Sequence, residues 1–348
     1  MLHSILQAYG LQQEKLNITT FGSGLINYTW RIKNAHKDYI LQRINDTVFK
    51  QPQSVAHNIK IISAYLQEHH PEYLFVVPVK TTLGEEMIFN KDEGYFRMFP
   101  FVSNSHTINV VQSPAQAYEA ARQFGKFTQL LSGFDSMQLK ITIPDFHNLS
   151  LRYRQFEQSL KFGNTERIKE ADTSIHYIKQ YAYIVDEFEK IKSNPGFKMR
   201  VTHHDTKISN VLFDDNNKGL CVIDLDTVMP GYFISDVGDM LRTYLSHVSE
   251  EEKDFSAIEI REEFFKAVIE GYSSEMKNEL SATEKKYFVY AGKFMIYMQA
   301  IRFLTDYLNG DVYYSTKYPD HNFVRANNQL VLLKQLIEKE KLFSQLKI

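Results

Sequence analysis

The most informative part of this chain reads Val201-Thr-His-His-Asp-Thr-Lys-Ile-Ser-Asn-Val-Leu-Phe213, followed by Cys221-Val-Ile-Asp-Leu-Asp226. It sets Asp205 five residues before Asn210, followed by two apolar runs with a polar turn, 214–217, between them. The second run ends in Asp224. Two short strands joined by this turn would bring Asn210 and Asp224 together, although fourteen positions separate them in the sequence. The pattern predicts a hairpin that gathers oxygen-bearing side chains at one point.

Phosphoryl transfer gives each of these side chains a purpose. Mg²⁺ bound to a triphosphate prefers hard oxygen ligands, which the Asn210 amide and the Asp224 carboxylate offer. Asp205 would accept a hydrogen bond from an attacking hydroxyl group and take its proton late in the reaction. Lys207 would lie where negative charge collects on the transferred group. We therefore predict Asp205 and Lys207 as catalytic residues, and Asn210 and Asp224 as ligands of Mg²⁺ with ATP as the cofactor.

Two other interpretations fit parts of the pattern. Each short motif, taken alone, occurs by chance as the polar end of a strand, but the ordered combination at this spacing is much rarer. His203, His204 and Asp205 would also suit a hydrolytic metal. No second histidine cluster at ligand spacing and no HExxH helix accompany them in the sequence. Phosphoryl transfer is therefore the preferred interpretation.

Composition limits the class of protein. The chain has 348 residues, 43% of them hydrophobic, which is enough for about two domains with a substantial core. The formal net charge of −2 lacks the basic excess typical of nucleic-acid binding. Cys221 is the single cysteine, and neither a secretory signal nor an apolar run long enough for a membrane span is visible. We expect a cytoplasmic protein without nucleic-acid or membrane partners, whose oligomeric state the sequence leaves open.

Periodicity divides the chain near Pro100. Before it, strands are expected within 18–44 and at 74–79, 87–90 and 94–99, with one helix over 54–67. After it, helices are expected over 114–131, 152–160, 175–191, 236–245, 258–272, 283–308 and 323–347. We predict an α+β protein with two lobes. Residues 1–100 would form a small antiparallel-sheet lobe that binds nucleotide, and residues 101–348 a larger, mainly helical lobe for catalysis and acceptor binding.

Several strings resemble a known superfamily. They are Gly22-Ser-Gly-Leu-Ile-Asn27, Tyr39-Ile-Leu-Gln-Arg-Ile-Asn45, Arg97-Met-Phe-Pro-Phe101, Pro144-Asp-Phe-His147, His204-Asp-Thr-Lys-Ile-Ser-Asn-Val-Leu-Phe213, Val222-Ile-Asp-Leu-Asp-Thr-Val-Met-Pro-Gly231 and Arg302-Phe-Leu-Thr-Asp-Tyr-Leu-Asn-Gly-Asp-Val-Tyr313. The catalytic strings resemble the aminoglycoside phosphotransferase and choline kinase superfamily, and the whole set resembles its N-acetylhexosamine 1-kinases. The resemblance implies a protein-kinase-like fold and ATP-dependent phosphorylation of the anomeric hydroxyl of N-acetylglucosamine or N-acetylgalactosamine.

The nucleotide site is expected in the first lobe. The turn Gly22-Ser23-Gly24 would let backbone amides approach phosphates, although glycines in hairpins are usually ordinary turns. A kinase needs a cation on its third strand, and here Gln42 and Arg43 occupy that place on opposite faces. We predict Arg43 as the cation, while the alternation leaves open which of the two faces the nucleotide. The helix over 54–67 holds no carboxylate to pair with it.

The junction between the lobes suggests further contacts. Phe99 and Phe101 would pack on adenine, although a buried edge strand suits the same residues. Asp236 is expected to cap the helix that it precedes. Asp226 would either support the magnesium shell or cap the following loop, and the sequence favours neither.

The acceptor site is expected near the C-terminal end of the second lobe. The resemblance implies that Arg302, Asp306 and Tyr313 contact the acceptor. His147 and Arg152 are weaker candidates. An Arg and an Asp four residues apart also suit a solvated pair on one helix face. Both interpretations stay open at this point.

Two rival functions remain. One is the same chemistry on another acceptor, such as an aminoglycoside, choline, ethanolamine, methylthioribose or homoserine. The other is a nucleotide-binding scaffold without catalysis, which the unusual Gln42-Arg43 pair would suit. Protein substrates are not expected, because no activation segment is recognisable between Asp226 and Asp236.

Overall fold

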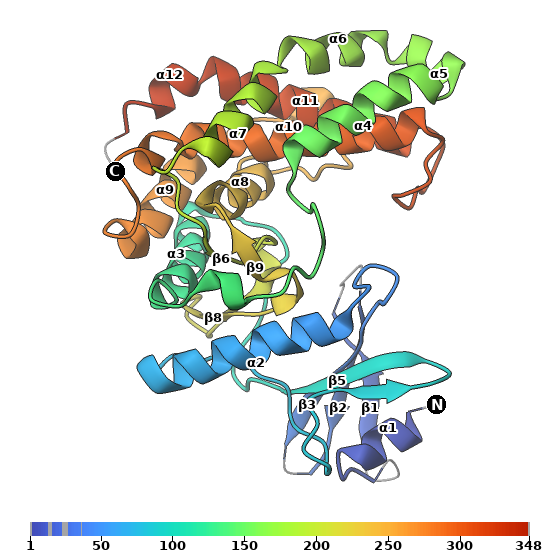
Figure 1. Cartoon of the computed structure of the whole chain (residues 1–348), viewed down its shortest axis with the longest axis vertical. Coiled ribbons are helices and arrows are strands. Elements are labelled where there is room, and N and C mark those ends of the chain that lie inside the picture. The colour runs from blue at the N-terminus through green and yellow to red at the C-terminus, as the bar shows by residue number, and fades with distance from the viewer. Residues whose placement is uncertain (1, 13–15, 23–26, 36, 347–348) are drawn as a thin grey trace. The chain divides into compact units, whose positions relative to one another are not determined.

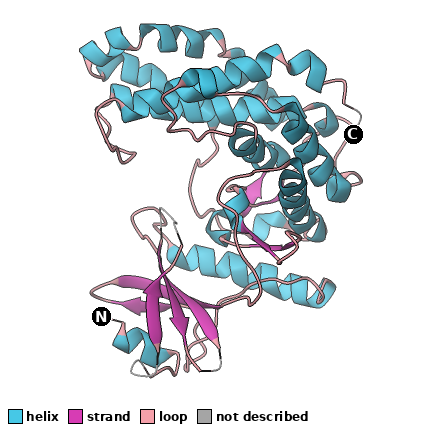
Figure 2. Ribbon diagram, turned by 180° about the vertical axis from the view of Figure 1, so that it is seen from behind, coloured by secondary structure: helices cyan, strands magenta, loops and turns pink. Residues whose placement is uncertain are grey.

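The computed structural model describes residues 2–12, 16–22, 27–35 and 37–346. The chain forms two compact units. The first consists of Met1–His106, Gly133–Pro144 and Leu212–Pro230, and the second of Thr107–Ser132, Asp145–Val211 and Gly231–Ile348. Strands dominate the first unit and helices the second (Figure 1, Figure 2). The lobe boundary after residue 100 stays a prediction, and each unit is considered below by itself.

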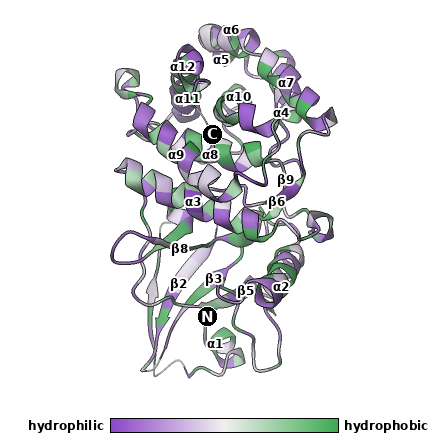
Figure 3. Ribbon diagram, turned by 90° about the vertical axis from the view of Figure 1, so that its left-hand side faces the viewer, coloured by the Kyte–Doolittle hydropathy of each residue, from purple (hydrophilic) through white to green (hydrophobic). Residues whose placement is uncertain are grey.

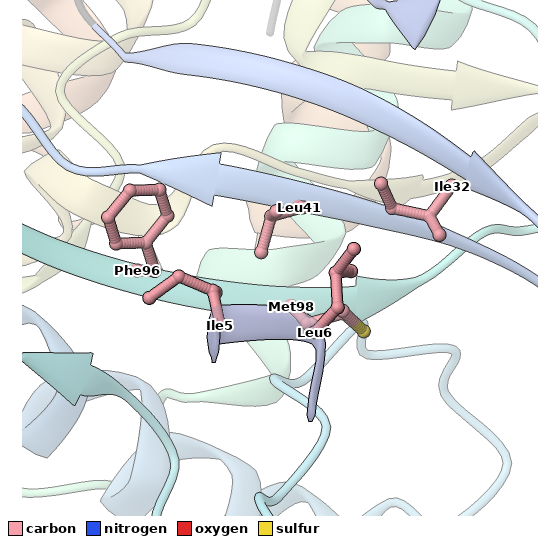
Figure 4. Close-up of a cluster of buried hydrophobic side chains, with 6 residues drawn as sticks. All are labelled: Ile5, Leu6, Ile32, Leu41, Phe96 and Met98. Atoms are coloured by element: carbon pink, nitrogen blue, oxygen red, sulfur yellow. The ribbon is translucent and has the colours of Figure 1, made fainter. Parts of the chain in front are cut away.

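A five-stranded antiparallel sheet forms the centre of the first unit, with strand order β1-β2-β3-β5-β4. The strands are β1(Asn17–Thr20), β2(Tyr28–Lys33), β3(Asp38–Arg43), β4(Ile88–Asn90) and β5(Gly94–Pro100). A short helix, α1(His3–Ala8), that the sequence did not predict packs on one face of the sheet. Figure 4 shows Ile5 and Leu6 of this helix against Leu41, Phe96 and Met98. Because successive side chains of a strand point to opposite faces, the residues next to Leu41, Phe96 and Met98 face the other side of the sheet.

The helix predicted over 54–67 is confirmed as α2(Pro52–His69), which buries Val55, Ile59, Ile62 and Leu66 at helical spacing. The strand predicted at 74–79 is wrong. Val79 does donate a backbone hydrogen bond to Met98, but Pro78 has no N–H group with which to extend a ladder. This segment therefore runs as an extended connection.

The hairpin that carries the predicted metal ligand is confirmed. Its strands are β7(Val211–Phe213) and β8(Gly219–Val222), which pair with each other around the polar turn. A 3₁₀ turn, η3(Ile208–Asn210), precedes β7, and another, η4(Leu225–Thr227), follows β8. The remaining short strands are β6(Arg200–Thr202) and β9(Met229–Gly231).

Helices make up most of the second unit. They are α3(Pro114–Leu130), α4(Leu149–Phe162), α5(Thr165–Glu170), α6(Asp172–Gln180), α7(Tyr183–Ser193), α8(Phe233–Tyr244), α9(Glu262–Met276), α10(Phe288–Leu308), α11(His321–Glu338) and α12(Glu340–Phe343). The long α10 is buried on nearly every side and packs against α4, α7, α8 and α11. The outer helices carry both hydrophilic residues, purple in Figure 3, and hydrophobic residues, green. No helix among the described residues combines the length and apolar character that a membrane crossing requires.

Several helix boundaries differ from the sequence prediction. The helix expected over 175–191 is two helices, because the chain turns at Tyr181 and Ala182 between α6 and α7. The helix expected from 258 begins at Glu262, after a 3₁₀ turn at Phe255–Ala257. The last predicted helix ends at Glu338, with the short α12 after it. Tertiary packing, more than hydrophobic periodicity, sets these ends.

Candidate active site

Three of the predicted catalytic and metal-binding residues lie together in the second unit. Lys207 Nζ is 3.1 Å from Asp205 Oδ1. The side-chain amide of Asn210 donates to the backbone carbonyl of Asp205 at 2.9 Å and to its Oδ2 at 3.1 Å. The 3₁₀ turn η3 produces this contact, because it folds Asn210 back over the residue five positions earlier. The loop thus holds a carboxylate, an ammonium and an amide as one group.

The environment of Asp205 keeps it ionised. Burial acts to raise its pKa, but Lys207, His203 and the hydrogen bond from Asn210 together outweigh burial and lower the pKa below the usual value. Asp205 in turn raises the pKa of Lys207 against the opposing effect of burial. An ionised Asp205 suits a group that accepts a hydrogen bond from a hydroxyl.

Helix α8 fixes the backbone of this loop. The carboxylate of Asp236 accepts hydrogen bonds from the backbone N–H groups of His203, at 3.0 Å, and His204, at 2.7 Å. The expectation that Asp236 caps the helix is wrong, since α8 begins at Phe233 after Tyr232 and Asp236 lies inside its first turn. Burial raises the pKa of Asp236 to about 7, against the lowering effect of those two hydrogen bonds.

A second carboxylate of α8 extends the anchor. Asp239 accepts the backbone N–H of Thr206 at 2.8 Å and is paired with Arg242 at 3.0 Å. The hydroxyl of Tyr244 donates to the carbonyl of Thr206 at 2.7 Å. Sequence reasoning missed Asp239 as an anchor of the loop. The signal was present, because two acids on an otherwise apolar helix need buried partners.

The predicted metal ligand Asp224 belongs to the first unit. It has a left-handed backbone, with φ 60° and ψ 62°, and immediately precedes η4. Its side chain lies at an exposed position. Because Asn210 lies in the second unit, the meeting of these two ligands stays a prediction.

The residues present fit a nucleotide-bound divalent ion. Asn210 uses its amide nitrogen toward Asp205, so its side-chain oxygen is the atom available for a cation. Among the described residues, no group of three His, Cys, Asp or Glu side chains could hold a metal. An ion that takes most of its ligands from phosphates and water requires only one or two protein oxygens. The hydrolytic-metal alternative gains no support from the part of the chain that the structure describes.

The two candidates on the third strand point to opposite faces of the sheet. Arg43 shares the face of Leu41, and its guanidinium lies 5.8 Å from the centre of the Tyr28 ring. Gln42 turns to the other face, where its side-chain oxygen accepts from the guanidinium of Arg97 at 2.9 Å. The role of Arg43 as the nucleotide cation stays a prediction. Arg97 is a cation of the sheet that sequence reasoning did not single out.

Two other predicted nucleotide segments approach each other through an aromatic contact. The ring of Phe101 lies 6.1 Å from that of Phe21, which directly precedes Gly22 and its positive φ of 79°. Phe99 packs at 5.0 Å from the guanidinium of Arg97. The glycine turn and the predicted adenine segment are therefore neighbours. Ser23 and Gly24, the other two members of the turn, lie outside the described residues.

A pocket of about 500 Å³ opens in the second unit. It is lined by Arg152, Gln155, Gln158, Ser159, Phe162, Arg302, Thr305, Asp306, Asn309, Val312, Tyr313 and Tyr314. Three of the four predicted acceptor residues, Arg302, Asp306 and Tyr313, are in this set. They come from the end of α10 and the loop that follows it. Arg152 of α4, a weaker candidate from the sequence, also lines the pocket, whereas the other lining residues of α4, such as Phe162, were not predicted.

The carboxylate of Asp306 mainly holds the backbone of the loop that lines the pocket, and it offers little free charge to a ligand. Its two oxygens accept backbone N–H groups from Val312, Tyr313 and Tyr314 at 3.0, 2.8 and 2.8 Å. The side chain of Asn322 donates to it at 3.0 Å. Four donors thus surround this buried carboxylate, which holds the loop that carries Tyr313.

Two arginines give the pocket its charge. Arg302 makes one long hydrogen bond, 3.4 Å to Gln299, and lies 5.8 and 5.5 Å from the ring centres of Tyr313 and Tyr314. Arg152 has a buried Nε atom with no hydrogen-bond partner. Burial and the neighbouring Arg302 lower the pKa of Arg152. Repulsion between these guanidinium groups favours a ligand that brings oxygen acceptors.

The fourth predicted acceptor residue, His147, does not line this pocket. Its Nδ1 atom is 3.2 Å from Nδ1 of His204, next to Asp205 in the chain, and its ring stacks on Phe146. Burial and the cationic side chains around it hold the pKa of His147 well below its ordinary value. His147 is thus a neutral neighbour of the catalytic loop, and its contact with an acceptor stays a prediction.

Solved structures with the same architecture are similar along nearly the whole chain. An amicoumacin kinase solved with AMP-PNP and Ca²⁺ matches with a TM-score of 0.64 at 15% identity, over 97% of this chain and 92% of that one. A microcompartment-associated aminopropanol kinase matches with 0.62 at 14%, over 98% and 97%. A choline kinase from Cryptosporidium parvum matches with 0.56 at 14%, over 97% and 96%.

The fold is therefore the protein-kinase-like one predicted from the sequence, with a small antiparallel-sheet lobe and a larger helical lobe. Residues 17–278 match the model of the phosphotransferase enzyme family, and the chain belongs to that family. The predicted phosphotransferase family is thereby confirmed, whereas the resemblance to N-acetylhexosamine 1-kinases stays a prediction about the acceptor.

Proposed function

We propose that this protein transfers the γ-phosphate of ATP to the anomeric hydroxyl of N-acetylglucosamine or N-acetylgalactosamine, forming the sugar 1-phosphate. Asp205 would orient the hydroxyl and accept its proton, with Lys207 beside it at 3.1 Å. Asn210 and Asp224 would hold Mg²⁺, which neutralises charge on the triphosphate when bound. The nucleotide and Ca²⁺ in the amicoumacin kinase structure support a nucleotide and a divalent ion here.

The observation that carries the choice of acceptor is the charge of the pocket. Arg152 and Arg302 face it, while four N–H donors occupy the carboxylate of Asp306. Hydroxyl and amide carbonyl oxygens are the acceptors that such guanidinium groups bind. An N-acetylated hexose supplies several of them and carries no positive charge.

Cationic acceptors suit this pocket poorly. Choline and aminopropanol, named for two of the similar structures, carry positive charge at neutral pH. A quaternary ammonium binds best over open aromatic faces, but Arg302 already lies over Tyr313 and Tyr314. Repulsion by the two arginines would disfavour both acceptors, and also the polycationic aminoglycosides.

The rest of the lining supports a sugar. Gln155, Gln158 and Asn309 contribute side-chain amides, which both donate and accept hydrogen bonds. Tyr313 and Phe162 add aromatic surface at the mouth, where both are largely exposed. A sugar ring with polar hydroxyl groups and apolar C–H faces matches a pocket lined by both amide and aromatic side chains.

A panel of acceptors tests the proposal. Purified protein with Mg-ATP is offered N-acetylglucosamine, N-acetylgalactosamine, glucosamine and choline side by side, and ³¹P and ¹H NMR locate the phosphate. We expect phosphorylation at the anomeric oxygen of the N-acetylated sugars and a much lower kcat/KM for the two cations. A higher kcat/KM for choline or glucosamine than for both N-acetylated sugars would overturn the choice of acceptor.

Substitution of Arg152 tests whether this pocket binds the acceptor. Arg152→Gln should raise KM for the N-acetylated sugar by about tenfold, the order lost with one charged hydrogen bond, and should relax discrimination against glucosamine. Arg154→Gln is the matched control, because Arg154 lies on the same helix at an exposed position. Equal behaviour of both variants would remove Arg152 from the acceptor site.

A further inference from the structure

A buried ion pair joins the sheet of the first unit to the turn that follows Asp224. Arg97 Nη2 on β5 lies 2.6 Å from Asp226 Oδ1, and the side chains are 4% and 2% exposed. Phe96 and Met98, the neighbours of Arg97, face the cluster under α1, so the guanidinium necessarily faces the other side of the sheet. Among the described residues, Arg200–Glu284 at 10% and 0% exposed and Arg242–Asp239 at 11% and 6% are the ion pairs that come nearest to it in burial.

Neutral side chains complete this cluster. Arg97 donates from Nε and Nη2 to the side-chain oxygen of Gln42, at 3.1 and 2.9 Å. Asn27 donates to Asp226 Oδ2 at 2.8 Å, and its own oxygen accepts the backbone N–H of Asn45 at 3.0 Å. Arg97 and Asn27 thus converge on one carboxylate, while Gln42 of β3 holds the guanidinium, so the cluster has a fixed geometry.

That carboxylate stands two residues after the predicted metal ligand. Asp226 lies in η4, and Asp224 directly before this turn has a left-handed backbone. Such a conformation persists only when the surroundings hold it. Helix α2 holds the far end of the same turn, because the side chain of Asn58 donates to the carbonyl of Val228 at 2.9 Å. The position of Asp224 therefore depends on contacts made by Asp226 and Val228.

We propose that Arg97 is a positioning residue for the metal ligand Asp224 and acts through Asp226. This rests on the proposed role of Asp224 toward a nucleotide-bound divalent ion. The single carboxylate of α2, Glu68, lies exposed near the end of the helix. The partner of the sheet cation is Asp226 instead, and α2 contributes the neutral Asn58 to the turn.

Stability alone does not explain the pair. Replacing a buried ion pair by apolar residues of similar volume is often neutral or stabilising, because desolvation of two charges offsets their attraction. The pair instead fixes direction, because Nε and Nη2 of the guanidinium both donate to Gln42 while Nη2 also lies in ion-pair contact with Asp226, which permits little rotation. Removing it should therefore change metal binding more than folding.

The experiment measures divalent-ion binding without an acceptor. Binding of ATP to Arg97→Met is titrated with Mg²⁺ by calorimetry, and Mn²⁺ binding to the ATP complex is followed by electron paramagnetic resonance. We expect the Mg²⁺ concentration for half-maximal ATP binding to rise by about tenfold or more, as for other residues that support a metal ligand. Asp226→Asn should produce a similar rise, and the double variant no more than either single one.

Controls separate positioning from folding. Arg122→Met removes an arginine that pairs with Glu119 and Glu275 in the second unit and should leave the Mg²⁺ dependence unchanged. Arg97→Lys keeps the charge and should restore part of the metal affinity, and it serves as the test variant if Arg97→Met does not fold. A folded Arg97 variant with the Mg²⁺ dependence of the wild type would overturn the inference.

The readout also distinguishes this inference from the proposed acceptor. If the wild type binds Mg-ATP but phosphorylates no N-acetylated sugar, the proposed acceptor fails while the role of Arg97 is still decided by the titration. If the wild type binds ATP without any dependence on a divalent ion, the positioning role fails even where a sugar is phosphorylated.

Discussion

At the scale of single residues, the chemistry of Asp205 depends on three neighbours that the chain supplies locally. Lys207 and Asn210 lie two and five positions further along, and His203 two positions before. Together they outweigh burial and lower the pKa of Asp205. Local sequence therefore determines the charge state of the Asp205 carboxylate. Two predictions belong to this scale.

Asp205→Asn should leave ATP binding within about twofold of the wild type and lower kcat by about 10²–10⁴, the range typical of a lost general base. The amide has the same shape but accepts no proton. Steady-state kinetics and calorimetric ATP titration measure the two effects. Asp215→Asn, at an exposed position of the hairpin turn, is the control and should behave as wild type. A near-normal kcat for Asp205→Asn would contradict the assignment.

Lys207→Met should move the acidic limb of the kcat profile to higher pH. The folded pKa of Asp205 is lowered, so the ionised form is lost only as pH falls through that lowered value. Without Lys207, the largest of the lowering influences disappears and burial raises the pKa. A pH profile of kcat measures the shift, with circular dichroism verifying that the variant stays folded at each pH. An unmoved limb would mean that Asp205 does not govern it.

At the scale of elements, close helix contacts set the framework of the second unit. Gly125 on α3 and Gly271 on α9 allow these helices to approach backbone to backbone. A Cβ atom at 271 would lie 2.2 Å from the carbonyl oxygen of Tyr118, and one at 125 would lie 2.8 Å from that of Tyr272. Backbone atoms cannot move aside as a flexible side chain does, so these glycines are required by packing.

Gly271→Ala should therefore lower the free energy of unfolding by about 1–3 kcal/mol, the usual cost of overpacking, despite the better helix propensity of alanine. Urea denaturation followed by circular dichroism measures the change. Lys266→Ala on an exposed position of the same helix is the control and should change stability by less than about 0.5 kcal/mol. A Gly271→Ala variant as stable as the wild type would show that α3 and α9 can move apart without a loss in the free energy of unfolding.

At the scale of the whole molecule, ligand binding should couple to stability. A ligand that binds only the folded state stabilises it by about 2.7 kcal/mol at a concentration one hundred times Kd. ATP with Mg²⁺ should therefore raise Tm more than ATP with EDTA. Asp224→Ala should remove most of this difference and leave the effect of ATP alone. Differential scanning calorimetry measures it, and an undiminished Mg²⁺ effect in Asp224→Ala would exclude Asp224 as a ligand.

The sequence alone predicted much of this protein because the informative features are local. The spacing of Asp205 and Asn210, the hairpin before Asp224 and the strand-to-helix change near Pro100 all follow from short-range periodicity and turn chemistry. Its failures were also local, as at Pro78, where one missing N–H group ended a strand that the apolar run had suggested.

Only the tertiary structure decided which distant residues serve these local features. The ion pair of Arg97 with Asp226 and the anchoring of His204 by Asp236 each join groups that are far apart along the chain. Hydrophobic periodicity predicts which face of a helix or strand is buried. It does not predict which residue pairs with a charged side chain on that face. That choice is made by the packing of whole elements, because a carboxylate or guanidinium removed from water must find its counterpart wherever the fold brings one.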